Sequence, residues 1–406
     1  MGHEKLREVP VSLPRTFDRP DEPWHRYVTI DLIWYVLGYT LFHPWVACIV
    51  VLCLRAQYTP WHALEMRIAI AWAMLMCIIG IFNIFSDRVA YGRPREVHLA
   101  DEVIVITGGV QGLGGLLAET YGMRSANVAV LDTNKVDDDE AEEKGVLYYQ
   151  CDVSDEKQVE AAVAEIVEDV RPPPPRNALV VLHADRIQLG PPTILINNAG
   201  IVRPGSILDS TAAQVDQYAS LSISPSRLPS SDIHDRIFRT NTLSHFTLLR
   251  AILPHMLRER RGTIVTISSV LGRLGAANLS SYAASKAALL ALHASLRAEL
   301  AQTPDAQDIK TILVTPGQMG TDMFHGLKTP SNFLAPILSP AEVAKSIMGL
   351  IEKGESGEVA LPLYSRYAEV LATLPVGVQA LIRRWSGIDT AVADAGLVPK
   401  AVEEKN

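Results

Sequence analysis

A glycine-rich turn between an apolar run and a helical pattern constrains the fold of this chain more than any other feature of its sequence. Residues 102–134 read EVIVITGGVQGLGGLLAETYGMRSANVAVLDTN, in which Val103 to Ile106 and Val128 to Leu131 are short apolar runs. Glycine lets the backbone turn sharply and approach a phosphate closely, and the N-terminus of the following helix attracts its negative charge. The segment therefore predicts a strand, turn, helix and strand unit that binds a dinucleotide pyrophosphate. Its turn glycines are Gly108, Gly112 and Gly114.

The residue that ends the second apolar run bears on the choice of dinucleotide. Asp132 follows Gly108 by 24 residues. Its carboxylate can accept hydrogen bonds from the hydroxyls of an adenosine ribose and repels a 2′-phosphate. The sequence therefore favours NAD(H) over NADP(H), with NADP(H) as the alternative.

Further strands and helices alternate along the chain. Predicted strands run from Leu147 to Gln150, from Ile194 to Ile196, from Gly262 to Ile267 and from Thr311 to Val314, and a long helical pattern covers Ser281 to Ala301. Alternating β and α elements of this kind indicate an α/β fold with a Rossmann-type, doubly wound parallel sheet. In such sheets, ligands bind at the carboxyl ends of the strands.

Five motifs occur in the order and roughly the spacing of the classical short-chain dehydrogenase/reductase family, which residues 100–360 resemble. They are Thr107-Gly108-(three residues)-Gly112-Leu113-Gly114, Asn197-Asn198-Ala199-Gly200, Ser269, Tyr282-Ala-Ala-Ser-Lys286 and Pro316-Gly317. The resemblance implies an oxidoreductase that uses a nicotinamide dinucleotide and assembles as a homodimer. The chain also resembles membrane-associated members of the retinol and hydroxysteroid dehydrogenase type.

Tyr282 and Lys286 are four residues apart on one predicted helix, so their side chains emerge on the same face. A tyrosine that exchanges protons near neutral pH needs a pKa about three below its free value of about 10, and a neighbouring ammonium group and an oxidised nicotinamide favour the phenolate. By resemblance, Tyr282 donates and accepts the proton, Ser269 bonds the substrate oxygen, and Lys286 also holds the cofactor ribose. Asn241 matches the family asparagine that orders a water in the proton relay. Ser268 is the alternative to Ser269.

The resemblance also assigns cofactor contacts outside the glycine turn. Asp152 and Val153 lie where the family contacts adenine, and Thr321 lies where it contacts the nicotinamide carboxamide. Each polar residue has a plainer interpretation, Asp152 as a strand-end turn residue and Thr321 as a helix N-cap. The predicted cofactor-binding residues are Gly108, Gly112, Leu113, Gly114, Asp132, Asp152, Val153, Asn198, Ala199, Gly200, Tyr282, Lys286, Pro316, Gly317 and Thr321. No metal site is expected.

Residues 1–95 have the character of a membrane anchor. Leu32 to Leu54 is a run of 23 residues and Ile68 to Phe85 a run of 18, both without Asp, Glu, Lys or Arg. Such lengths can cross a hydrocarbon core of about 30 Å. Pro44 interrupts the first run, so a re-entrant segment is an alternative to a span, and a buried helical hairpin of a soluble protein is another.

Charge is distributed in keeping with this division. Residues 1–95 carry ten Lys and Arg against eight Asp and Glu, and the remainder carries 27 against 37, for a total of −8. A mildly acidic chain of this kind lacks the basic excess of a nucleic-acid-binding protein. The basic residues around the anchor lie mainly outside the loop between the runs, which predicts a cytosolic body if both runs span the membrane. The expected location is a membrane of the endoplasmic reticulum or a lipid droplet.

The domain prediction divides the chain into the anchor, a dinucleotide-binding domain at 96–362 and an amphipathic tail at 363–406. Two segments near 171–192 and 219–235 exceed the family's usual spacing, and their proline and serine clusters are typical of surface loops, unless they are errors in the gene model. In the tail, Tyr364 to Ile388 is either an interfacial helix or a cover for the substrate pocket.

Together these features predict a membrane-anchored oxidoreductase that transfers a hydride between NAD(H) and a lipophilic alcohol or carbonyl compound, such as a retinoid, a steroid or a long-chain lipid. An enzyme held at a bilayer has little use for that position if its substrate is freely soluble. The alternative is a nucleotide-binding scaffold or redox sensor whose extra loops have impaired catalysis.

Overall fold

The body of the protein is built on a seven-stranded parallel sheet in the order β3-β2-β1-β4-β5-β6-β7. The computed structural model describes residues 28–124, 126–168, 190–205, 231–321, 323, 329 and 331–391. The strand order reverses between β1 and β4, which is where doubly wound sheets bind their ligands. The strands are β1 (Val103–Thr107), β2 (Asn127–Asp132), β3 (Leu147–Gln150), β4 (Ile194–Asn197), β5 (Gly262–Ile267), β6 (Ile309–Pro316) and β7 (Gly357–Leu361).

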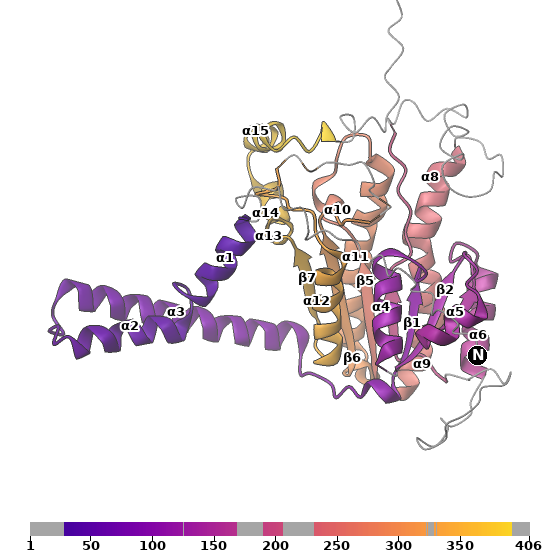
Figure 1. The fold of residues 1–406 in the computed structure, drawn as a ribbon, viewed down its shortest axis with the longest axis horizontal. Helices are drawn as coiled ribbons and strands as arrows, with labels where there is room; N and C mark the ends of the chain where they lie inside the picture. The colour runs from indigo at the N-terminus through magenta and orange to yellow at the C-terminus, as the bar shows by residue number, and fades with distance from the viewer. Residues whose placement is uncertain are drawn as a thin grey trace, which may run out of the picture.

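Helices cover both faces of the sheet (Figure 1). Alternate strand residues point to opposite faces, so Ile104 packs in one core with α4 and α12, and Val105 packs in the other with α6, α9 and α11. Because both faces are covered, all five residues of β1 are apolar or small and buried. The body helices are α4 (Gly112–Met123), α5 (Asp138–Lys144), α6 (Glu156–Glu168), α8 (Ser231–Phe238), α9 (Ser244–Glu259), α10 (Leu271–Leu274), α11 (Ser280–Gln302), α12 (Pro340–Glu352), α13 (Leu363–Arg366), α14 (Ala368–Thr373) and α15 (Val376–Ser386).

This arrangement confirms the predicted fold class. Each strand named from the sequence is present, with ends that differ by at most two residues, and the predicted helix at Ser281 to Ala301 is α11. The edge strand β7 was not among the predicted strands. It carries an exposed glutamate, Glu358, between less exposed neighbours and therefore lacks the continuous apolar run of a central strand.

The first predicted apolar run is not one helix. Residues 32–54 fall in α1 (Ile30–Tyr39) and α2 (Pro44–Ala56), which meet at an angle of 53°. Pro44 is the first residue of α2, where its missing N–H costs no helical hydrogen bond. The sequence left open whether this run spans or re-enters the membrane, and the bent pair fits a broken span as well as a re-entrant loop. The proline that the sequence places there is the reason for the bend.

The second apolar run lies in α3 (Leu64–Tyr91), a helix of 28 residues that is long and apolar enough to cross a membrane. Only 11% of its most apolar stretch is buried, unlike the core helix of a soluble protein. α2 packs along α3, and the Trp72 indole N–H donates to the Leu41 carbonyl across the hairpin at 3.0 Å. Figure 1 shows this hairpin projecting from the side of the body, with α1 leading back to it.

Several predictions fall outside the described residues. The N-terminal arm up to residue 27, residues 171–189 and 219–230 of the two predicted insertions, and the tail from residue 392 are not described. Of the predicted insertion at 219–235, residues 231–235 form the start of α8. The two predicted domain boundaries, after residues 95 and 362, stay predictions.

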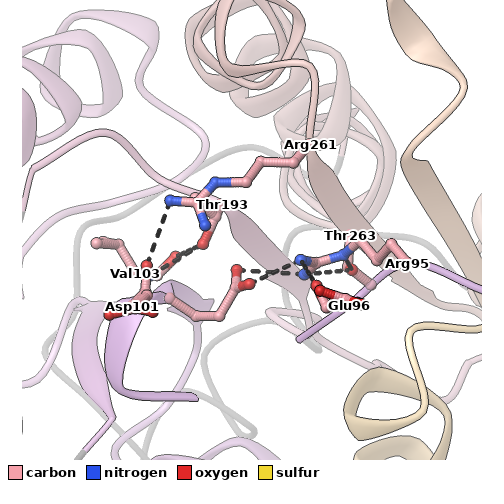
Figure 2. A network of polar contacts seen from close by, with 8 residues as sticks. Arg95, Glu96, Asp101, Val103, Thr193, Arg261 and Thr263 are labelled. Carbon is pink, nitrogen blue, oxygen red and sulfur yellow. Dashed lines mark hydrogen bonds and ion pairs between the residues drawn. The ribbon is translucent and has the colours of Figure 1, made fainter. Parts of the chain in front are cut away.

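A buried ion pair fixes the segment that joins the hairpin to the sheet. The Arg95 guanidinium donates to Glu102 at 2.7 and 3.2 Å and to the Thr263 hydroxyl of β5 at 3.2 and 3.1 Å (Figure 2). The two charged side chains are 3% and 1% exposed. The Arg95 backbone N–H donates to the Gly354 carbonyl at 2.9 Å. The chain therefore enters the amino-terminal edge of the sheet through a fixed joint.

We predict that Arg95→Ala lowers the free energy of unfolding by about 3–5 kcal/mol, because it leaves the Glu102 carboxylate buried without a partner. The matched control is Arg250→Ala, which breaks an ion pair with Glu156 whose side chains are 65% and 51% exposed. That change should cost less than about 1 kcal/mol. Urea unfolding of both detergent-solubilised variants measures the difference, and equal losses would contradict the assignment.

Candidate active site

The glycine turn after β1 has the backbone geometry that the sequence predicts. Gly108 and Gly112 have φ values of 63° and 64°, a region that residues with a Cβ rarely adopt. A Cβ on Gly114 would lie 2.3 Å from the Gly108 carbonyl oxygen and 2.4 Å from the Asn198 amide nitrogen. Leu113, between the last two glycines, is buried in the core below. The turn therefore offers bare backbone at a helix N-terminus, which fits a dinucleotide pyrophosphate.

Asn198 and Ala199 connect this turn to the end of β4. Their backbone N–H groups both donate to the Thr107 hydroxyl at 3.0 Å. The Asn198 side-chain amide donates to the carbonyls of Thr107 and Gly108 at 3.0 and 2.8 Å. These bonds hold the ends of β1 and β4 together at the point where the strand order reverses.

Asp132 lies at the end of β2 and is 9% exposed. Its two carboxylate oxygens accept from the backbone N–H groups of Val110, in the glycine turn, at 3.1 Å and of Asn134 at 2.9 Å. The bond to Val110 was not predicted from the sequence, and it gives Asp132 a part in shaping the turn. The carboxylate stands beside the turn, where a ribose would lie.

Tyr282 and Lys286 come together on the buried face of α11. Both side chains are less than 5% exposed, and the Lys286 ammonium lies 5.9 Å from the centre of the Tyr282 ring. The ammonium donates to the Ile267 carbonyl at the end of β5 at 2.9 Å. A Cβ on Gly200 would lie 3.4 Å from this ammonium, so the segment after β4 runs alongside it.

The two neighbouring serines after β5 point in different directions. The Ser268 hydroxyl donates to the Lys286 carbonyl at 2.7 Å and is thereby turned into the packing between β5 and α11. Ser269 forms a hydrogen bond with the Tyr282 side chain and also accepts from the Leu271 N–H at 3.2 Å. The geometry therefore places Ser269, and not Ser268, beside the tyrosine.

Burial moves the pKa values of these groups toward their neutral forms. It raises the pKa of Tyr282 to about 12, although the hydrogen bond with Ser269 acts in the opposite direction. It lowers the pKa of Lys286 to about 8. A site that uses Tyr282 as a base near neutral pH therefore needs a further positive charge close to the phenol.

Asn241 is fully buried at a π-helical turn (Arg239–Leu243) that precedes α9. Its oxygen accepts from the Ile201 N–H at 2.7 Å, and its amide donates to the Ile201 carbonyl at 2.9 Å and the Ser285 hydroxyl at 3.0 Å. It thus joins the segment after Gly200 to the helix that carries Tyr282. From its sequence position Asn241 was expected to order a water of the proton relay, and these three bonds were not predicted.

For the other predicted cofactor contacts, Asp152, Val153 and Thr321, the described contacts are with residues other than Ser269, Tyr282 and Lys286. The Asp152 carboxylate accepts from the backbone and hydroxyl of Ser154 at 2.9 and 2.7 Å, contacts that the strand-end turn interpretation explains. Val153 next to it is buried. Thr321 lies near Gly112, since a Cβ there would be 3.8 Å from its methyl group, while the residues that follow include undescribed positions.

Pro316 ends β6, and the Gly317 N–H donates to the Leu361 carbonyl at 2.7 Å. A Cβ on Gly317 would lie 2.7 Å from Pro362 and 2.8 Å from the Tyr364 hydroxyl oxygen. This glycine is needed because the segment after β7 crosses directly over the end of β6.

Two buried histidines below the site were not singled out from the sequence. His245 of α9 and His293 of α11 are 2% and 3% exposed, and burial lowers their pKa values to about 3 and 4. His293 pairs with the Thr266 hydroxyl at 3.1 Å. Both are therefore neutral near pH 7. Among the described residues, no cluster of three or more His, Cys, Asp or Glu forms a candidate metal site.

Comparison with known proteins agrees with this geometry. The family model described as short chain dehydrogenase matches residues 102–332, more than half of the chain. Uncharacterized oxidoreductase TDA5 of Saccharomyces cerevisiae is 30% identical over 76% of this chain and 82% of its own length. Epidermal retinol dehydrogenase 2 of Mus musculus is 30% identical over 73% and 85%. 17-beta-hydroxysteroid dehydrogenase 13 of Rattus norvegicus is 28% identical over 68% of this chain and 80% of its own length. The chain belongs to the short-chain dehydrogenase/reductase family of oxidoreductases.

Proposed function

We propose that this oxidoreductase is membrane-anchored and transfers a hydride between NAD(H) and a lipophilic alcohol or its carbonyl. The observation that carries the proposal is the grouping of Ser269, Tyr282 and Lys286 at the carboxyl edge of the sheet, beside the glycine turn. Similar proteins named as retinol and hydroxysteroid dehydrogenases support an alcohol of low polarity as the substrate.

A bound nicotinamide dinucleotide would supply the hydride acceptor or donor. Tyr282 exchanges the proton with the substrate oxygen, and Ser269 positions that oxygen through its hydroxyl group. The Lys286 ammonium, close to the phenol, and the positive charge of the oxidised nicotinamide together offset the burial that raises the pKa of Tyr282. Asn241 fixes the segment beside Lys286 and orders the water that returns the proton to solvent.

The dinucleotide would lie over Gly108, Gly112 and Gly114, with its adenosine ribose at Asp132. Asp132 is nearly buried, and a 2′-phosphate placed beside its carboxylate would be repelled. We therefore propose NAD(H) as the preferred cofactor. The other candidate contacts are Asp152 and Val153 on the adenine side, and Pro316, Gly317 and Thr321 on the nicotinamide side.

The proposed location is a membrane of the endoplasmic reticulum or a lipid droplet, with the body in the cytosol. α3 supports an anchor by its length and by the exposure of its apolar side chains. α15 adds a second apolar surface, since Val376, Leu381 and Trp385 are 81%, 66% and 75% exposed. α15 has no buried residue, which favours the interfacial helix over a pocket cover. A homodimer is proposed from the family alone.

A scaffold or sensor without turnover is the alternative function. It accounts less well for the arrangement, because a dinucleotide needs only the glycine turn and the end of β2, whereas the Ser269 and Tyr282 pair serves a substrate. Turnover by wild type and Tyr282→Phe separates these two functions, and two further experiments test the cofactor preference and the anchor.

Tyr282→Phe should reduce turnover by about 10²–10⁴-fold, because it removes the proton donor and keeps the ring. Binding of NADH, followed by its fluorescence, should stay nearly unchanged. Tyr121→Phe is the matched control, since its hydroxyl is buried without a hydrogen-bond partner among the described residues. Retention of more than about a tenth of wild-type activity in Tyr282→Phe would rule out the role given to this tyrosine.

Asp132→Ala should shift the preference from NAD(H) toward NADP(H), most strongly when an arginine is introduced nearby. Asp132→Asn keeps an acceptor for one backbone N–H and removes the charge, so it should shift the preference as well. The ratio of kcat/KM for the two cofactors measures the effect. A wild-type preference for NADP(H) would overturn the argument from repulsion.

Alkaline carbonate extraction tests the anchor. The full-length protein should stay with the membrane pellet, because spanning helices bind far more firmly than interfacial ones. A protein that lacks residues 1–90 should be released, or held weakly through α15 in a salt-sensitive way, and should still bind NADH. If the full-length protein washes off freely, α2 and α3 form a soluble hairpin and the argument for a lipid substrate fails.

A further inference from the structure

The first helix of the anchor is attached to the body at three consecutive places. The Ile30 N–H donates to the Phe333 carbonyl at 3.0 Å, and the Leu363 N–H donates to the Asp31 carboxylate at 2.5 Å. One turn further along α1, the Trp34 ring meets the Tyr367 ring edge-on, with the ring centres 6.4 Å apart. These contacts join residues that lie about 300 positions apart in the chain.

The partners of α1 belong to two segments of the body, residues 331–338 and 361–367. Both segments are bonded to the turn at residues 316–321, which follows β6. The Leu338 N–H donates to the Gln318 carbonyl at 2.9 Å, and the Gly320 N–H donates to the Leu338 carbonyl at 3.0 Å. On the other side, Leu361 accepts from Gly317 at 2.7 Å. α1 therefore contacts both segments that hold this turn.

The same turn lies beside the proposed cofactor site. Thr321 is close to Gly112, and the Tyr364 hydroxyl oxygen is 2.8 Å from the position of a Cβ on Gly317. Burial, together with the nearby Asp31 charge, raises the pKa of Tyr364 to about 12. The Asp31 carboxylate is thus close enough to Tyr364 to oppose ionisation of its phenol, which packs against Gly317 in the turn.

Apolar side chains are exposed along the line where α1 meets the body. They include Phe333 and Ile337 in segment 331–338, Tyr367 in segment 361–367 and Val370 in α14 just beyond it, all between 44% and 54% exposed. Figure 1 shows α1, α13, α14 and α15 on the same side of the molecule, toward the hairpin. Exposed apolar side chains grouped in this way are typical of surfaces that contact a membrane or a lipophilic ligand.

We propose that α1 is a positioning element of the substrate site, which holds segments 331–338 and 361–367 against the 316–321 turn and so completes the wall past which a lipophilic alcohol enters from the bilayer. This inference rests on the proposed function. Under it, Asp31 and Trp34 determine how well the substrate binds, and the anchor has a second task besides attachment.

The test uses the full-length protein in phosphatidylcholine vesicles with retinol as the probe. Asp31→Leu combined with Trp34→Ala should raise KM for retinol about tenfold, the loss expected from one hydrogen bond to a charged group. The kcat should change by less than about twofold, because the reacting groups are untouched. NADH affinity and carbonate-resistant membrane attachment should stay at wild-type values.

Two control variants separate positioning from general damage. The single variant Asp31→Asn keeps an acceptor for the Leu363 N–H, so its KM for retinol should stay close to the wild-type value. Tyr35→Ala removes an aromatic side chain of α1 that is 61% exposed and whose ring, among the described residues, is paired with Tyr39 of the same helix, so it should have no effect. An unchanged KM in the double variant, or a matching loss of NADH affinity, overturns the proposal.

A second measurement does not depend on turnover. Hydrogen exchange of the backbone amides in 331–338 and 361–367 should become faster in Asp31→Leu and stay unchanged in Asp31→Asn. If the wild-type protein oxidises neither retinol nor a hydroxysteroid, the proposed function fails, and exchange alone then decides the role of α1. Equal exchange in all variants overturns that role.

Discussion

Because the seven strands pair in parallel, all of them end at one edge of the sheet, and this constraint places the rest of the site. The glycine turn after β1, Ser269 after β5 and Gly317 after β6 reach the same edge although they are far apart in sequence. α11 then crosses beside β5 and brings Tyr282 and Lys286 to it. Once there, both groups are buried, and burial opposes their charged forms. The site thus places its groups closely and needs a further positive charge to lower the pKa of Tyr282, a charge that an oxidised nicotinamide ring can supply.

Much of this was predictable from local patterns. Short apolar runs that end in glycine, serine or proline identified β1, β5 and β6, since strands buried on both faces must be apolar throughout. The four-residue spacing of Tyr282 and Lys286 placed them on one helical face. β7 was missed because a sheet edge with an exposed Glu358 breaks that pattern. The bend at Pro44 was among the alternatives, and the structure selects it.

The contacts that the sequence did not predict are long-range hydrogen bonds. Asp132 reaches Val110, Asn241 reaches Ile201, and Asp31 reaches Leu363, each across a gap that residue spacing cannot indicate. The sequence shows where a carboxylate or an amide side chain occurs, but not whether its oxygen accepts from a ligand or from a backbone N–H. For Asp152 the plainer turn interpretation accounts for the observed bonds. Asp132 bonds to the glycine turn, and its contact with a ribose stays a prediction.

The joint at Arg95 has a mechanical consequence when it is taken together with α1. The hairpin meets the body at opposite edges of the sheet, through Arg95 and Glu102 at the amino-terminal edge and through α1 at the carboxyl edge (Figure 1). A body on a single flexible tether would swivel freely above a membrane and present every side of itself in turn. In the proposed membrane-anchored state, two separate attachments would resist such torque, so rotational diffusion about the anchor would be suppressed and the carboxyl edge of the sheet would keep one heading relative to the bilayer.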